Sequence, residues 1–242
     1  MASRSWSKWH KHQTLIKSAK LKPHLPATSL FSKTSFWRLL NQYDQVIVKP
    51  TNSSGGKGVI RISKKGRRQY EVHNGSKKRK IQGKDKVYAY VKKGRKQNHL
   101  VQQRIPLATV DKRPFDLRVM VQRRVHSKWK VTGKLAKVAG KGYIITNTRR
   151  SHGMILPIKK AIKRSSIHKK STRKLKRHIN KVALLTAKQI KKKYPSARTL
   201  GIDMGLDRSG KPWIIEVNFT PMKSLFLKLK NKSIYRRILS YV

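Results

Sequence analysis

The stretch "GIDMGLDRSGKPWIIEVNFTP", residues 201–221, has the strongest structural signal in the sequence. Two runs of alternating apolar residues flank "DRSG", a turn signal, so the stretch predicts a β-hairpin. Asp203 would lie on one face of the first strand, and Glu216 and Asn218 would lie on the same face of the second. The apolar residues predicted to share the opposite face are Ile202, Met204 and Leu206 in the first strand, and Trp213, Ile215 and Val217 in the second.

The predicted hairpin places Asp203 directly across from Glu216, and two facing carboxylates repel each other. The chain has only 8 acidic residues against 62 lysines and arginines, so this pairing calls for a cation. A lysine would supply that cation in a purely structural, salt-bridged hairpin. Alternatively, the oxygen donors of Asp203, Glu216 and Asn218 suit a hard ion such as Mg²⁺ better than zinc.

A second informative stretch is the glycine-rich loop in "KPTNSSGGKGVIRI", residues 49–62. A Walker A loop would need glycine at Thr51 and serine or threonine at Gly58. A dinucleotide fingerprint also fails, because a β-rich segment rather than a helix follows the glycines. "QVIVKP" and "GVIRIS" read instead as antiparallel strands with the loop as their mobile tip. Together with the strand residue Lys49 and the oxygen donors, this loop indicates a nucleoside triphosphate site.

Hydrophobic patterning predicts the remaining elements. A short helix is expected at about 33–43, strands at 99–105, 115–125 and 129–138, and a helix at 171–194 capped by Ser171 or Thr172. The stretch "GSKKRKIQGKDK", residues 75–86, reads as a polar loop. In the long helix, the apolar positions with helical spacing are Leu175, Ile179, Val182, Ala183 and Ile190. Its other face is almost entirely basic.

Composition limits the possible functions. The chain of 242 residues is 37% hydrophobic, enough for a real core, but its formal net charge of +54 costs the compact state self-repulsion. A polyanion or high salt would offset that charge. The absence of cysteine excludes disulfides, thiol catalysis and cysteine-ligated zinc. No signal-peptide core or membrane-span run is present, so we expect a cytoplasmic protein. The scattered histidines are expected on the solvated surface.

The order of these motifs carries a resemblance. The sequence resembles ATP-grasp proteins, most closely the spore-coat-associated YheC/YheD-type family. The motifs that carry this resemblance are, in order, a strand lysine, a Ser/Gly loop, "VQQRI", "FDLRVMV", "TNTRR", Asp203 and "EVNFTP". The similarity runs from about residue 8 to 222. It implies an α+β ATP-grasp fold whose two α+β lobes hold ATP between them. A basic arm and short helix (1–43) would precede a small lobe with a glycine-rich flap (44–98) and a larger lobe with the metal hairpin and basic helices (99–242). Residues 1–30 are too short for the pre-ATP-grasp domain of typical relatives.

The resemblance also implies roles for individual residues. The nucleotide-binding positions would be Lys49, Ser54, Gly55, Gly56, Lys57, Gly58, Gln102, Gln103, Ile105 and Asp116. The positions acting on the phosphoryl and acyl groups would be Arg118, Lys137, Asn147 and Arg150, and the magnesium ligands would be Asp203, Glu216 and Asn218. Two departures stand out: Lys137 replaces an arginine of many relatives, and Ser151 and His152 replace a glycine pair.

The implied activity is ATP- and Mg²⁺-dependent ligation of a carboxylate to an amine or similar nucleophile through an acyl phosphate, in a spore-associated protein. The sequence identifies neither the carboxylate nor the amine. Two alternatives remain: a spore structural protein that binds ATP without ligation, and a binder of nucleic acid or another acidic polymer on an ATP-grasp scaffold. The basic face of residues 171–194 leaves polyanion contact open.

Overall fold

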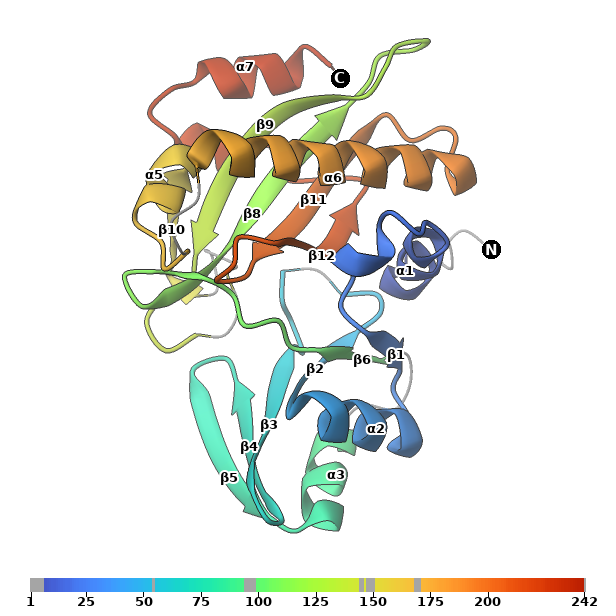
Figure 1. Ribbon diagram of the computed structural model, residues 1–242, viewed down its shortest axis with the longest axis vertical. Helices are drawn as coiled ribbons and strands as arrows, with labels where there is room; N and C mark the ends of the chain where they lie inside the picture. Colours follow the sequence, from blue (N-terminus) through green and yellow to red (C-terminus); the bar gives the residue numbers. More distant parts are fainter. Residues whose placement is uncertain are drawn as a thin grey trace.

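The computed structural model describes residues 7–53, 55–93, 99–143, 146, 151–167 and 171–241. The described chain forms two lobes, each built on an antiparallel sheet with helices packed against it (Figure 1). This architecture confirms the predicted α+β class. The elements in chain order are α1 (Lys8–Ile16), η2 (Lys22–His24), β1 (Thr28–Leu30), α2 (Lys33–Tyr43), β2 (Gln45–Pro50), β3 (Ile60–Gly66), β4 (Gln69–Asn74), β5 (Lys77–Gln82), α3 (Lys84–Lys92), β6 (His99–Gln103), β7 (Thr109–Val110), β8 (Arg113–Gln122), β9 (Lys130–Val138), β10 (Met154–Pro157), α5 (Ile158–Lys163), α6 (Thr172–Lys193), β11 (Thr199–Leu206), β12 (Pro212–Asn218), η3 (Ser224–Lys228) and α7 (Ser233–Leu239).

The smaller lobe contains a sheet with strand order β1-β6-β2-β3-β4-β5. Strands β2 and β3 flank the glycine-rich loop and pair antiparallel, as predicted. Alternate residues such as Val46, Val48, Ile60 and Ile62 are buried against α2 and α3. The opposite face of this sheet is more polar and turns toward the larger lobe.

Two predictions for this lobe had different outcomes. The helix at 33–43 is confirmed as α2, where Ser32 and Ser35 form a capping box. The prediction of a polar loop at 75–86 was wrong, because this stretch contains β5 and the start of α3. Strand β5 is an edge strand held by main-chain pairing with β4, and its side chains are nearly all exposed. Such a strand needs no hydrophobic alternation, so its pattern does not predict it.

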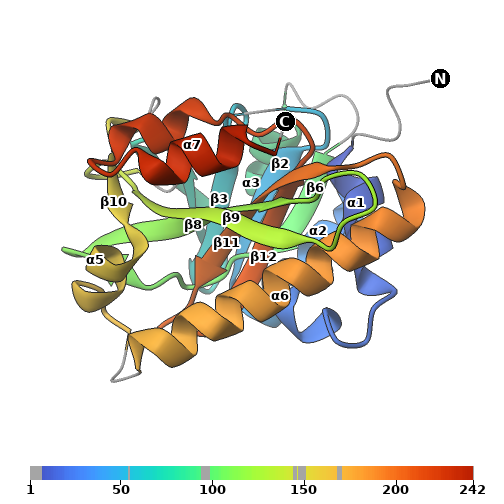
Figure 2. The ribbon, with the colours of Figure 1, turned by 90° about the horizontal axis from the view of Figure 1, so that it is seen from above.

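The larger lobe contains a second sheet, ordered β10-β9-β8-β11-β12, with the short β7 paired to β8. Helices α5 and α6 cover one face, and η3 and α7 cover part of the other, so that α6 and α7 lie on opposite sides of the sheet (Figure 2). The long predicted helix is confirmed as α6, with Ser171 as its N-cap and the five predicted apolar positions buried. The uncovered part of the second face turns toward the small lobe.

Helix α1 was not predicted from the basic N-terminal sequence. It packs against α6 and β12 of the larger lobe, and a hydrogen bond from the Lys8 amide to the Thr51 carbonyl joins its first residue to the glycine-rich loop (3.0 Å). Helix α1 therefore links the base of that loop to the larger lobe. Among the described residues, no helix is both long and apolar enough to cross a bilayer.

Candidate functional site

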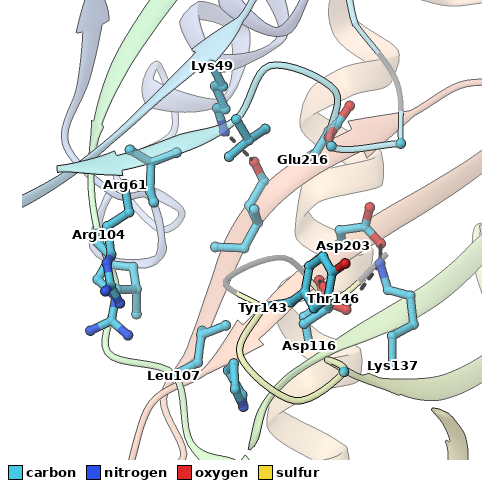
Figure 3. Close-up of a pocket in the computed structure, with 18 of the residues that line it drawn as sticks. Lys49, Arg61, Arg104, Leu107, Asp116, Lys137, Tyr143, Thr146, Asp203 and Glu216 are labelled. Carbon is cyan, nitrogen blue, oxygen red and sulfur yellow. Dashed lines mark hydrogen bonds and ion pairs between the residues drawn. The ribbon is translucent and has the colours of Figure 1, made fainter. Parts of the chain in front are cut away.

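A cavity of about 1460 Å³ lies between the two lobes. Its walls come from β2, β3, β4, β5 and β6 of the small lobe and from β8, β9, β11 and β12 of the larger one. Figure 3 shows Asp203 and Glu216 on one side of this space, Arg61 and Arg104 on the other, and Lys49 at the top between them. Most of the predicted site residues that the structure describes line this single cavity.

The predicted hairpin forms, with its two acids facing each other. Strands β11 and β12 pair antiparallel, with Asp203 opposite Glu216, and the register then shifts by one residue between Asp203 and Met204. Because of this β-bulge, Ile214 and Val217 point into the core and Ile215 lines the cavity. The prediction that Trp213, Ile215 and Val217 share one face, opposite Glu216 and Asn218, was therefore wrong. Strict alternation does not continue through a bulge.

Asp203 is the centre of a buried charge cluster. The Nε and Nη2 atoms of Arg118 donate to its two carboxylate oxygens at 2.9 and 3.1 Å, and the Nζ atom of Lys137 donates to Oδ1 at 2.9 Å. Burial by itself raises the pKa of Asp203, but Arg118 and Lys137 outweigh it and hold that pKa well below its usual range. Asp203 is therefore ionised at neutral pH, and it orients both cations in the cavity wall.

Lys137 also connects Asp203 to Asp116. Its Nζ atom lies 3.1 Å from Oδ1 of Asp116, the residue opposite it across β8 and β9. The hydroxyl of Thr146 donates to the other oxygen of Asp116. Burial raises the pKa of Asp116 and lowers that of Lys137, but for Lys137 the two aspartates outweigh burial and keep its pKa raised. Lys137 thus remains a fixed cation.

Lys49, at the end of β2, is buried beside the larger lobe. Its Nζ atom donates to Oε1 of Gln102 at 2.8 Å and to the main-chain oxygen of Ile215 at 3.5 Å. Gln102 in turn donates to Thr28 at 2.8 Å. Burial lowers the pKa of Lys49 to about 8, although Glu216 opposes this shift. The Gln102 side chain therefore positions the ammonium group of Lys49.

Lys8 is a functional candidate that the sequence analysis missed. It projects from the first turn of α1 into the same cavity, with Nζ 3.5 Å from Oε1 of Glu216. The same ammonium group donates to the main-chain oxygen of Ser53 in the glycine-rich loop. Lys8 thus connects the loop with the β11–β12 hairpin. One lysine among 62 basic residues has no local signal that would single it out.

The glycine-rich loop has the predicted backbone freedom. Gly55, Gly56 and Gly58 have positive φ values of 65, 76 and 74°, a region that side chains disfavour. Gly55 and Gly56 line the cavity, whereas Lys57 and Gly58 are not part of its wall. Gln102, Gln103 and Ile105 line it from β6 and the segment after it. Ser54, Asn147 and Arg150, the other predicted site residues, lie outside the described residues.

The donors in this cavity fit a magnesium ion better than a zinc ion. No group of three or more His, Cys, Asp and Glu side chains suited to a metal forms among the described residues. Asp203, Glu216 and Asn218 supply two carboxylates and an amide, and Mg²⁺ is commonly bound by one or two carboxylates together with water and substrate phosphates. Among the described residues Lys8 is the one ion-pair partner of Glu216, so this carboxylate is more easily released than that of Asp203.

Comparisons with known proteins agree with this architecture. The family model described as "YheC/D like ATP-grasp" matches residues 2–242. Two curated relatives from Bacillus subtilis (strain 168) are the endospore coat-associated proteins YheD, 26% identical over 91% of this chain, and YheC, 21% identical over 92%. These alignments cover 49% of YheD and 61% of YheC, so the chain spans about half the length of one relative and three fifths of the other.

Solved structures of ATP-grasp ligases share the fold. The ligase PsnB with a precursor variant, Mg and ADP matches 99% of this chain and 58% of its own at a TM-score of 0.57 and 15% identity. The D-alanine–D-alanine ligase of Bacillus anthracis with ATP matches 98% of this chain and 64% of its own at a TM-score of 0.55 and 14% identity. At these identities the likeness shows the fold alone. With the family model matching nearly every residue, the chain belongs to the YheC/D-like ATP-grasp family.

Proposed function

We propose that this protein is an ATP- and Mg²⁺-dependent ligase that activates a carboxylate as an acyl phosphate and transfers the acyl group to an amine or similar nucleophile. The observation that carries the proposal is the meeting of Lys49, Arg118 and Lys137 with Asp203 and Glu216 in one cavity beneath a glycine-rich loop. This combination places cations for phosphate oxygens beside oxygen donors for a hard metal ion.

In this proposal each group has a defined task. Lys49 and the loop amides bind the phosphates, while Asp203, Glu216 and Asn218 hold Mg²⁺, which would offset negative charge on the phosphoryl group. Arg118 and Lys137, fixed by Asp203, stabilise charge on the oxygens of the γ-phosphate. The substrate carboxylate forms a bond to the γ-phosphorus as the bond to ADP breaks. The amine then attacks the acyl carbon, phosphate leaves, and the amine nitrogen loses a proton.

The test is ADP release from the purified chain with ATP, Mg²⁺ and pools of carboxylates and amines. A pool that stimulates release, together with an Arg118→Gln variant that binds ATP but releases little ADP, supports the ligase. ATP·Mg²⁺ binding without stimulated release from any pool supports the alternative of an ATP-binding structural protein. The names of the two curated relatives favour an association with the endospore coat in either case.

A second candidate function is binding of an acidic polymer, and helix α6 favours it. The exposed face of this helix carries a series of cations and no acid: Arg173, Lys174, Arg177, Lys181, Lys188, Lys191, Lys192 and Lys193. Like charges four residues apart, as in Arg173 and Arg177, destabilise a helix unless a partner offsets them. Helix α6 lies on the far side of the second sheet from α7, along the outside of the molecule (Figure 2).

A further inference from the structure

The cavity extends well past the part that the proposed nucleotide site uses. In the small lobe, strand register places Gln102, Ile47, Arg61, His73 and Lys78 in one row across β6, β2, β3, β4 and β5. All five line the cavity. Neighbouring strands are about 4.8 Å apart, so His73 lies about 10 Å from Ile47 along the sheet. The volume of about 1460 Å³ also exceeds the roughly 300–1,000 Å³ of usual ligand pockets.

Two polar atoms in this row are buried without a hydrogen-bond partner: Nε of Arg61 and Nδ1 of His73. His73 is only 3% exposed, contrary to the surface position predicted for the histidines. Unsatisfied buried polar atoms are rare in native proteins, and each calls for an explanation such as a missing ligand. Here both atoms belong to side chains that line the same cavity, which makes a shared ligand the simplest explanation.

The two unpaired atoms, Nδ1 of His73 and Nε of Arg61, need opposite kinds of hydrogen-bond partner. Nε2 of His73 lies 3.1 Å from the main-chain oxygen of Gly142, which can only accept, so Nε2 carries a proton. Burial, followed by the charge of Arg61, lowers the pKa of His73, so the ring is neutral and Nδ1 accepts a hydrogen bond. Nη2 of Arg61 donates to Glu71 at 2.9 Å, leaving Nε as a free donor. A ligand here must therefore offer an acceptor and a donor close together.

The charge around this row indicates an anion. Arg104 also lines the cavity near Arg61. Burial lowers its pKa, and the charge of Arg61 lowers it further. Arg104 forms no ion pair with any described residue. Lys78 adds a third cation at the outer edge of the sheet. Glu71 offsets only Arg61. This part of the cavity wall is therefore left with surplus positive charge, and Figure 3 shows two of its cations, Arg61 and Arg104, side by side.

We propose that Arg61, His73, Lys78 and Arg104 form a subsite for an acidic peptide, the substrate of the proposed ligase. Peptide carboxylates would accept from the three cations, and a peptide N–H would donate to Nδ1 of His73. A fully ionised phosphate offers acceptors only and leaves Nδ1 unsatisfied. His73 also contacts Gly142, which is close in sequence to Thr146, and Thr146 donates to Asp116 beside Lys137. The inference rests on the proposed function, because that function requires a carboxylate substrate.

Calorimetric titration of the full chain, saturated with Mg²⁺ and a non-hydrolysable ATP analogue, tests the subsite with hexaglutamate and hexaglutamine. We expect hexaglutamate to bind at least about tenfold more tightly than hexaglutamine, since hydrogen bonds to charged groups are the stronger ones. Lys78→Gln and Arg104→Gln should each weaken hexaglutamate binding about tenfold. His73→Phe should weaken both peptides, because it removes the acceptor for the N–H.

Lys77→Gln is the matched control, since Lys77 is the neighbour of Lys78 on β5, is exposed, and does not line the cavity. Equal binding of the two peptides, or equal losses in Lys77→Gln and Lys78→Gln, would overturn the subsite and indicate diffuse charge attraction. The analogue titration separates this failure from that of the proposed function. Failure of the analogue and Mg²⁺ to bind contradicts the ligase, whereas analogue binding without peptide selectivity contradicts the subsite alone.

Discussion

Glu216 and Asp203 face each other across the β11–β12 hairpin, but their carboxylates are held differently. Asp203 binds Arg118 and Lys137 through close hydrogen bonds, whereas the carboxylate of Glu216 has a 3.5 Å contact with Lys8. We predict that Mg²⁺ raises ATP affinity and that Glu216→Gln reduces this gain about tenfold or more, because a charged oxygen ligand is lost. Isothermal titration with and without Mg²⁺ measures the gain.

Asp85→Asn provides the control for this prediction. It removes one negative charge from the first turn of α3, away from the cavity wall, and should keep the full magnesium gain. The same Mg²⁺ dependence in Glu216→Gln and in the unmodified chain would contradict the assignment of Glu216 as a metal ligand.

Lys49 gives a prediction about pH. Burial lowers its pKa to about 8, so the ammonium form that attracts phosphate is lost as pH rises through 8. We expect ATP affinity to fall between about pH 7 and 9, and Lys49→Gln to bind about tenfold more weakly at pH 7 with a flatter pH profile. Lys134→Gln removes a lysine that burial also shifts to a pKa of about 8 but that does not line the cavity. An unchanged decline in Lys49→Gln would mean that another group causes it.

At the scale of elements, the glycine-rich loop is the part of the site expected to change on binding. It connects β2 and β3, and Lys8 of α1 contacts its main chain at Thr51 and Ser53. We predict that ATP·Mg²⁺ slows amide hydrogen exchange across 52–58, because bound phosphates order the loop amides. Exchange in the β4–β5 turn at Gly75 serves as the internal reference. No change across 52–58 at saturating ATP·Mg²⁺ would argue against a flap.

Gly58 ends this loop where β3 is about to begin. Its φ is +74°, and an added Cβ would lie 2.9 Å from Cγ of Pro50. Gly58→Ala should destabilise the loop conformation by about 1–3 kcal/mol and weaken ATP binding about tenfold. Gly75→Ala, at φ +62° with no atom within 4 Å of the added Cβ, introduces similar backbone strain away from the cavity. Its ATP affinity should stay unchanged. Thermal unfolding and ATP titration of both variants make the comparison.

At the scale of the whole molecule, the net charge of +54 exceeds what a triphosphate site needs. If α6 binds an acidic polymer, its affinity should fall steeply with salt. For duplex DNA, a plot of the logarithm of the binding constant against the logarithm of the salt concentration should have a slope of about −0.9 for each neutralised phosphate. We expect the combined variant Arg177→Gln, Lys181→Gln and Lys188→Gln to reduce that slope. The combined variant Lys64→Gln, Lys65→Gln and Arg67→Gln, in the exposed end of β3 and the turn after it, should reduce it less.

Filter binding of duplex DNA and of polyglutamate across a range of salt measures these slopes. No binding to either polymer at low salt would reject polyanion binding and leave the charge without a defined partner. A preference for polyglutamate accompanied by ATP turnover would instead indicate that the basic surface contributes to the enzymatic function.

The sequence by itself determined the elements whose side chains are sorted by burial. Helices α2 and α6 and strands β2, β3 and β8 have apolar residues at the spacing that their buried faces require. The pairing of Asp203 with Glu216 was also expected from the sequence, but the turn "DRSG" does not fix it alone. Next to the turn Met204 pairs with Ile214, and the bulge between Asp203 and Met204 then brings Asp203 opposite Glu216. Local patterning is sufficient wherever burial on one face decides the conformation.

Only the tertiary structure decided which distant groups meet. Strand β5 and helix α1 were missed because main-chain pairing and docking hold them more than their own patterns do. The contact of Lys8 with Glu216, the burial of His73 and the surplus charge at Arg104 all depend on how the lobes face each other across the cavity. The sequence around each of the 62 basic residues does not indicate which few are desolvated in the fold. Desolvation depends on the neighbours that pack around a residue and not on the residue itself.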